Sequence, residues 1–262
     1  MKKRSVCSRI LRAAAFVLAA LALLALVNFV PAFSLKTADM RELSGTHVTV
    51  FYEHEQAAAE DVFTLAEARG GELAQLLGLA QQEPVQIYIY DQQSVMQTKK
   101  YGLIAQLLHL DWYIGDNIGA KVLLTSPANP GSAHTYHDNR TAALHELVHA
   151  YNSLLKPDMT YWVDNGLAGY LSGQKPSYPV ASYSPLPTLE QTRVLGPLAP
   201  VSFANFGGYE YSYTYIEYLA DTYGWDAVKA FAKNGDYPAA FGADEAAVYD
   251  AWTVFVKGAY SE

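Results

Sequence analysis

The sequence has a single cysteine, Cys7, which lies in a basic stretch at the N-terminus. No disulfide can form within one chain, so stability must come from an apolar core or from a bound metal. Beyond residue 7 the sequence also excludes a cysteine-based metal site and a cysteine nucleophile.

Charged residues are few, at 17% of the chain against 51% hydrophobic residues. This balance excludes an intrinsically disordered protein and suits one folded domain. The net charge is −8, and residues 1–32 hold five basic and no acidic side chains, so the remainder carries −13. So acidic a body, with no basic stretch, argues against nucleic acid as a partner.

One long hydrophobic run is present, from Ala13 to Val30, and the five basic residues precede it. This pattern is typical of a signal peptide or an N-terminal membrane anchor, which we assign to residues 1–32. Residues 10–30 are long enough to span a bilayer, and Ala32 offers a small residue at which a signal peptidase could cut. The sequence therefore predicts an extracytoplasmic protein, secreted or anchored to the membrane, with both alternatives open.

The remaining sequence predicts a linker at 33–45 and one α+β domain at 46–262. Alternating or β-branched segments predict a small sheet, and apolar periodicity predicts helices that become dominant after residue 140. The expected strands are 46–52, 84–90 and 120–125, and the expected helices are 56–79, 94–110, 140–155, 161–171, 209–223, 225–233 and 244–259. Six prolines between residues 173 and 200 indicate a long loop.

The segment His145-Glu-Leu-Val-His149 lies within one of these expected helices, for which Asp138 or Asn139 is a plausible N-cap. Residues four apart share a helix face, so both imidazoles can bind one ion. Glu146 would lie beside that ion as a general base and acid. This spacing predicts a hydrolytic zinc site, whose metal activates water and takes three protein ligands.

A second motif follows at Trp162-Val-Asp-Asn-Gly-Leu-Ala-Gly-Tyr170. Together the two motifs resemble those of the gluzincin metallopeptidases, closest to the peptidase MA-like group. The resemblance implies a zincin-like fold, with a sheet lobe at 46–155 and a helical lobe at 156–262. It also implies Zn²⁺ as cofactor and hydrolysis of peptide bonds in a peptide or protein substrate.

The second motif departs from the family at the third zinc ligand, where the family has glutamate and this sequence has Asn165. An amide oxygen is a weaker zinc ligand than a carboxylate. The alternatives for the third zinc ligand are Asn165 itself, the adjacent Asp164 and a distant carboxylate. A further alternative is that the protein has no tight zinc site. The distant candidates are Glu190, Glu210 and Glu217.

Two further roles follow from the same resemblance. The family places a tyrosine or histidine near the developing oxyanion, which here implies Tyr209, or next to it Tyr211. It also holds an extended substrate on an edge strand of the sheet, which implies substrate binding by Val122, Leu123 and Leu124. His134 and His137 precede the motif helix and either line the cleft or are solvated.

The expected function is therefore that of an extracytoplasmic zinc peptidase. The alternative is a catalytically weak relative that binds peptides or cell-surface material. Asn165 motivates this alternative, whereas the intact Glu146 speaks against it.

Overall fold

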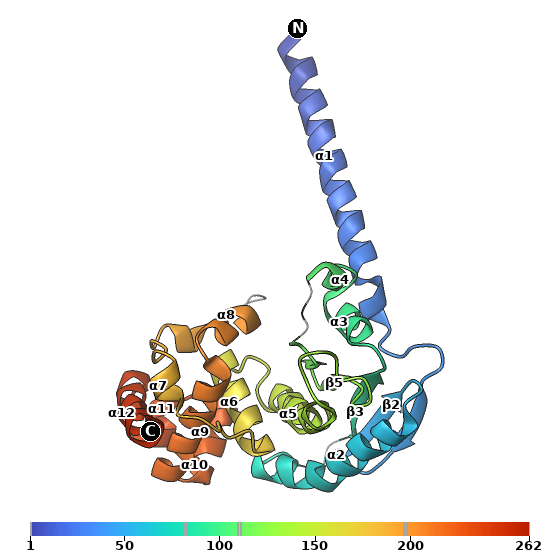
Figure 1. Ribbon diagram of the computed structural model, residues 1–262. Coiled ribbons are helices and arrows are strands. Elements are labelled where there is room, and N and C mark those ends of the chain that lie inside the picture. The colour runs from blue at the N-terminus through green and yellow to red at the C-terminus, as the bar shows by residue number, and fades with distance from the viewer. Residues whose placement is uncertain (1, 81–82, 109, 111, 196–198, 262) are drawn as a thin grey trace.

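The computed structural model describes residues 2–80, 83–108, 110, 112–195 and 199–261 as an α+β protein with a five-stranded mixed sheet (Figure 1). The strands are β1 (Arg41–Ser44), β2 (Val48–Tyr52), β3 (Val85–Tyr90), β4 (Gly115–Ile118) and β5 (Lys121–Thr125). The helices of the first half are α1 (Lys2–Phe29), the 3-10 helix η1 (Val30–Phe33), α2 (Gln56–Leu76), α3 (Gln93–Tyr101), α4 (Ala105–Leu108) and α5 (Tyr136–Leu155). The second half contains α6 (Tyr161–Ser172), α7 (Val180–Tyr183), η2 (Gln191–Arg193), α8 (Ala199–Asn205), α9 (Gly208–Tyr223), α10 (Trp225–Asn234), α11 (Tyr237–Phe241) and α12 (Glu245–Ala259).

The sheet has the strand order β1-β2-β3-β5-β4 and is covered on both faces. Strands β2, β3 and β5 are parallel, and β1 and β4 pair antiparallel at the two edges. Alternate side chains of a strand point to opposite faces. Ile87 and Ile89 of β3 accordingly join the core with α2 and α5, whereas Tyr88 and Tyr90 pack with Met96 of α3 on the other face.

The sequence did not predict the two edge strands. Residues 41–44 lie in the expected linker, but they form β1 and pair with β2. Strand β4 has the sequence Gly-Asp-Asn-Ile, whose polar residues are typical of turns. The expected helix at 94–110 is also interrupted, because Gly102 adopts a φ of +80° between α3 and α4.

The expected edge strand is an internal strand, which corrects the prediction for Val122, Leu123 and Leu124. All three side chains are fully buried, and β5 pairs with β3 on one side and β4 on the other. Their backbone groups are therefore not free to bind an extended substrate. A fully buried apolar run looks the same in sequence whether one or two neighbours flank it.

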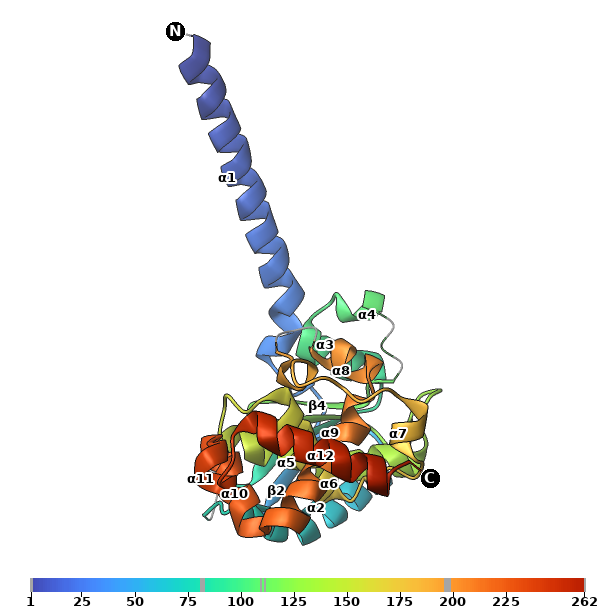
Figure 2. The ribbon, with the colours of Figure 1, turned by 90° about the vertical axis from the view of Figure 1, so that its left-hand side faces the viewer.

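The helical half packs around aromatic side chains. Trp252 of α12 is fully buried, and its indole N–H donates to Thr214 Oγ1 at 3.1 Å. Trp162 of α6 lies beside it, with ring centres 5.5 Å apart. Figure 2 shows α12 crossing in front of α6 and α9. This packing fixes α6, which also contacts α5, relative to the sheet.

Helix α1 projects from the body (Figures 1 and 2). Within the described residues, one helical segment is long and apolar enough to cross a membrane, from Ser8 to Phe33, and none of it is buried. A core helix would be covered by other elements, whereas this exposed segment has the length, composition and N-terminal position of a signal sequence or a membrane span.

Candidate active site

Helix α5 carries the first motif. It begins at Tyr136, four residues before the expected start, because Thr135 rather than Asp138 or Asn139 is its N-cap. Thr135 and Asp138 form a reciprocal capping box, with the Thr135 N–H donating to Asp138 Oδ2 at 2.8 Å. The apolar side chains of the motif, Leu147 and Val148, are buried in the core. The polar side chains are thereby directed to the opposite side of the helix.

The two motif histidines lie side by side, with ring centres 4.7 Å apart and ring planes at 75°. His145 Nδ1 lies 2.8 Å from Oε1 of Gln174, in the loop after α6. His149 Nδ1 lies 2.8 Å from Oδ1 of Asp164. Each ring thus has its Nδ1 next to an oxygen, which leaves Nε2 as the atom available to another ligand.

Asp164 acts on His149 from the first turn of α6. The contact is an ion pair at short range, although the ring N–H is not aligned with the carboxylate oxygen. Oδ1 of Asp164 also accepts from Asn152 Nδ2 at 2.8 Å. Asp164 therefore holds the ring of His149 through Nδ1.

Asn165 is buried and lies on the other side of the same turn. Its Nδ2 donates to the Tyr161 carbonyl at 2.9 Å. The side chain also lies near His145 and slightly raises the pKa of that imidazole. Because Nδ2 is directed to Tyr161, the amide oxygen is the atom that remains for His145 or for an ion beside it.

Glu146 is buried beneath strand β4. A Cβ atom on Gly115 would lie 2.9 Å from Cγ and Oε1 of Glu146, so only glycine lets the strand approach this closely. Burial raises the pKa of Glu146 to about 8, and the carboxylate of Asp116 adds to the rise. Burial thus favours the protonated form of this carboxyl group, and the nearby His149 opposes it.

The surroundings shift the pKa values of the two motif histidines in opposite directions. Burial lowers the pKa of His145 to about 3, and the neighbouring His149 lowers it further. Burial also opposes the charge on His149, but Asp164 and Glu146 outweigh it and raise the pKa of His149 to about 9. A neutral His145 beside a cationic His149 is the charge state that these neighbours favour.

Sequence reasoning missed a second charged cluster on β4. Asp116 is buried, and its Oδ1 accepts from Lys100 Nζ at 2.8 Å. The Tyr101 hydroxyl lies 2.8 Å from that of Tyr113 and can donate to Oδ2 of Asp116 at 3.3 Å. Burial raises the pKa of Asp116 while Lys100 opposes the rise. No motif marks these residues, because they come from two elements that meet only in the fold.

Of the two tyrosines named from the sequence, Tyr209 lines the cavity and Tyr211 does not. Tyr209 reaches the site, where its hydroxyl lies 3.3 Å from that of Tyr161. Burial raises the pKa of Tyr209 to about 12, so it is a hydrogen-bond donor at neutral pH. Tyr211 is fully buried elsewhere and donates to the Ser184 carbonyl at 2.6 Å.

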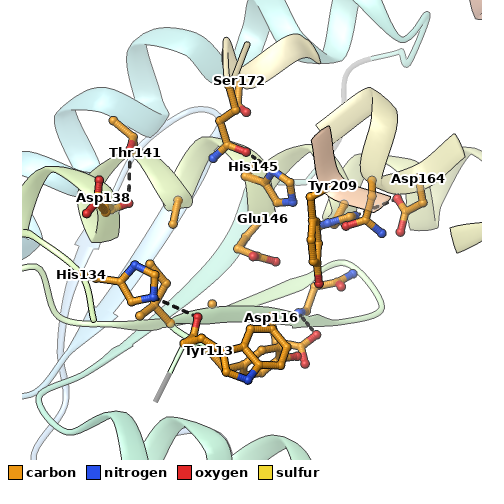
Figure 3. Close-up of a pocket in the computed structure, with 18 of the residues that line it drawn as sticks. Tyr113, Asp116, His134, Asp138, Thr141, His145, Glu146, Asp164, Ser172 and Tyr209 are labelled. Carbon is orange, nitrogen blue, oxygen red and sulfur yellow. Dashed lines mark hydrogen bonds and ion pairs between the residues drawn. The ribbon is translucent and has the colours of Figure 1, made fainter. Parts of the chain in front are cut away.

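One cavity of about 730 Å³ lies between β4, α5, α6 and α9. It is lined by His145, Glu146, His149, Asn165 and Tyr209. Figure 3 shows His145, Glu146 and Tyr209 pointing into it, with Asp116 on the wall below. His134 and His137 also line the cavity, and His134 Nε2 lies 2.9 Å from the Trp112 carbonyl. The distant carboxylates Glu190, Glu210 and Glu217 are not among the described residues that line it.

Among the described residues, no group of three or more His, Cys, Asp or Glu side chains is arranged to hold a metal ion. Asn165, a polar residue on the same cavity wall, is an amide, which such a group does not include. Comparisons with protein-family models, with curated proteins and with solved structures gave no match.

Proposed function

We propose that this protein is a metal-dependent hydrolase of the gluzincin kind, a zinc peptidase that acts outside the cytoplasm. One observation carries the proposal. His145, Glu146 and His149 open into one cavity, and each imidazole has its Nδ1 next to a side-chain oxygen. Histidines held in this way through Nδ1 present Nε2 to a metal in many metalloenzymes. The proposal includes a zincin-like fold.

The residues present fit a zinc ion with two strong ligands and one weak ligand. The strong ligands would be Nε2 of His145 and His149, and the weak one the amide oxygen of Asn165. Gln174 and Asp164 would hold the two rings. When bound, zinc would supply Lewis acidity and would make water acidic enough to lose a proton near neutral pH.

Glu146 would move the proton. Its carboxyl group lies in the cavity, next to His145 in sequence and beneath Gly115. A carboxylate with a raised pKa is suited to accept a proton from water and to return it to a leaving amine. Tyr209 would donate a hydrogen bond to the oxyanion that develops on the substrate carbonyl.

The substrate would bind along β4, which is the edge strand on the cavity side. The Thr125 N–H donates to the Ile114 carbonyl at 2.8 Å, which fixes the alternation of the β4–β5 pair. Gly115 therefore directs its own N–H and carbonyl away from β5. An extended peptide can pair with this free edge next to Glu146, so we propose Gly115 in place of the β5 residues.

A second candidate function is peptide binding without hydrolysis. The neutral Asn165 favours it, since two imidazoles and an amide hold zinc less tightly than two imidazoles and a carboxylate. The cavity and the free edge of β4 would serve binding equally well.

The deciding experiment is the zinc content and affinity of the full chain in detergent. We expect one zinc per chain, lost in His145→Ala and His149→Ala but retained in His137→Ala, a histidine on the cavity wall. Glu146→Gln should retain zinc and lose hydrolysis of an unstructured peptide mixture. A wild-type chain that binds no zinc at micromolar metal would refute the hydrolase and favour peptide binding.

A further inference from the structure

The end of α1 is fastened to the turn between α3 and α4. The carbonyl of Asn28 accepts from the Leu103 N–H at 3.0 Å, and its Oδ1 accepts from the Ile104 N–H at 2.8 Å. Its Nδ2 donates to the Tyr101 carbonyl at 3.2 Å. A Cβ atom on Gly102 would collide with Asn28. The apolar helix and this turn therefore form one unit.

Exposed apolar side chains surround this junction, and we call them the juxtamembrane patch. From α1 and η1 it contains Phe29, Val30 and Phe33, and from the α3–α4 turn and α4 it contains Leu103, Ile104 and Leu107. Phe33 and Leu107 are 78% and 76% exposed. Large apolar side chains gathered on one surface indicate a contact with another apolar phase.

The charge of this region differs from that of the body. Residues 91–111 contain Lys99 and Lys100 and are flanked by Asp91 and Asp111, so their net charge is zero, whereas residues 33–262 carry a net charge of −13. Lys99 Nζ donates to the Ser34 carbonyl at 2.5 Å and so lies beside η1. Anionic lipid headgroups would repel most of the body but not this segment.

The position of α4 fits a bilayer crossed by α1. Figures 1 and 2 both show α4 beside the C-terminal end of α1, on the side of the body that faces along this helix. The apolar segment of 26 residues is about 39 Å long, whereas the hydrocarbon core is about 30 Å thick. The last turns of the segment, with the patch beside them, therefore reach the headgroup region.

We propose that the juxtamembrane patch is a membrane-interface surface. Helix α4 lies shallowly in the headgroup region of the bilayer that α1 crosses. The membrane span of α1 and the shallow insertion of α4 together hold the body against the membrane. The basic residues in the first turns of α1 are expected on the cytoplasmic side, which places the body and the patch outside. Trp112 lies four residues after α4 and lines the cavity, so the cavity wall is held near the lipid. This inference goes beyond the proposed hydrolysis and does not depend on it.

The test measures how close α4 lies to lipid in the full chain. Cys7→Ser removes the only cysteine, and Leu107→Cys then carries a fluorophore in vesicles of phosphatidylcholine and phosphatidylglycerol. Val254→Cys on α12 is the matched control, because Val254 is apolar and 73% exposed. A nitroxide on the lipid chain near the headgroup should quench the label at 107 several-fold more than the label at 254.

Two results would overturn the proposal. The first is equal quenching at positions 107 and 254. The second is a label at 107 that is shielded from aqueous iodide only at high protein-to-lipid ratio, which would mean that a second copy covers the patch. In a variant that also carries Leu103→Ser and Ile104→Ser, quenching at 107 should fall towards the control. Circular dichroism of each variant shows whether it is folded.

Discussion

Oδ1 of Asp164 lies 2.8 Å from Nδ1 of His149, and both residues line the same cavity. The sequence offered Asp164 only as a candidate third ligand, whereas this contact has the geometry of a carboxylate that orients His149. A carboxylate at Nδ1 orients the imidazole and makes it a better metal ligand, and it does not itself reach the metal. The neighbouring Asn165 is then the remaining candidate on α6 for the third ligand.

Asp164→Asn should weaken zinc binding without abolishing it. We expect a loss of affinity of about 10- to 100-fold, which is typical when the partner of a metal-binding histidine is removed. Zinc titration against a chelating dye measures it. Asp158→Asn is the control, since Asp158 is an exposed carboxylate that pairs only with Lys156. Complete loss of zinc in Asp164→Asn would instead identify Asp164 as a ligand.

Asn165→Glu should strengthen zinc binding. The substitution puts a carboxylate where the amide oxygen faces His145, and a charged oxygen ligand binds Zn²⁺ more tightly than a neutral one. We expect the dissociation constant to fall by about tenfold or more. Asn165→Gln controls for the added length without the charge. If the two variants bind zinc equally, the side chain at 165 does not contact the metal.

Gly166→Ala should destabilise the protein because α6 and α9 touch at this position. A Cβ atom there would lie 2.5 Å from the Ser212 carbonyl oxygen and 2.7 Å from a carbon of Ile216. Backbone cannot move aside as a flexible side chain can, so we expect a loss of about 1 to 3 kcal/mol in urea unfolding.

Gly169→Ala is the matched control on the same helix. Its Cβ would meet only the Tyr213 ring at an ordinary distance of 3.7 Å. Alanine favours the helix by about 1 kcal/mol over glycine, so this variant should be as stable as wild type or more stable. Equal losses in both variants would show that helix propensity, and not the contact between α6 and α9, controls position 166.

The metal-free protein should lose stability as the pH rises through the pKa of Glu146. The folded state raises this pKa from 4.5 to about 8, so the folded chain binds the proton more tightly than the unfolded chain. The resulting stabilisation is full below pH 4.5 and is lost as the pH rises through 8. Glu146→Gln stays neutral throughout and lacks this dependence.

Urea unfolding in chelator at pH 5 and pH 9 checks this. Between pH 5 and pH 9 the free energy of unfolding of the wild type should fall by at least about 1 kcal/mol more than that of Glu146→Gln. This difference corresponds to a shift of one pKa unit. The pKa of His149 is raised in part by Glu146, so His149 loses stability over the same pH range in both chains, but less in Glu146→Gln, and the difference between the chains includes this coupling. A parallel pH dependence in both chains would contradict a raised pKa at Glu146.

The sequence predicted the elements that carry their own pattern. Helix α6 was predicted within one residue, and β3 within one residue, because apolar periodicity and β-branched runs are local signals. Strand β4 has no such signal, since Asp116 and Asn117 are turn formers that become strand only by pairing with β5. The edge of the sheet was therefore assigned to the wrong strand.

The residues of the candidate site likewise fall into those that local sequence spacing predicts and those that only tertiary packing brings together. His145, Glu146 and His149 share one helix, so their spacing alone predicted that they meet. Gln174, Asp116 and Tyr161 reach the cavity from three other segments, and only tertiary packing brings them there. The sequence could not separate Tyr209 from Tyr211 either, since two positions along a helix turn the side chain by about 200° and both are tyrosines in a tyrosine-rich segment.

Tyr209→Phe should lower peptide hydrolysis while zinc stays bound. The hydroxyl is directed into the cavity beside that of Tyr161, where it can donate to an oxyanion, and losing one such donor typically costs about 100-fold or more in kcat. Tyr211→Phe is the control, because it removes a buried hydroxyl that donates to the Ser184 carbonyl outside the cavity. It should lower stability by about 1 kcal/mol and leave kcat unchanged. Since both variants lose one tyrosine hydroxyl from the same helix, a fall in kcat confined to Tyr211→Phe would contradict the assignment of Tyr209.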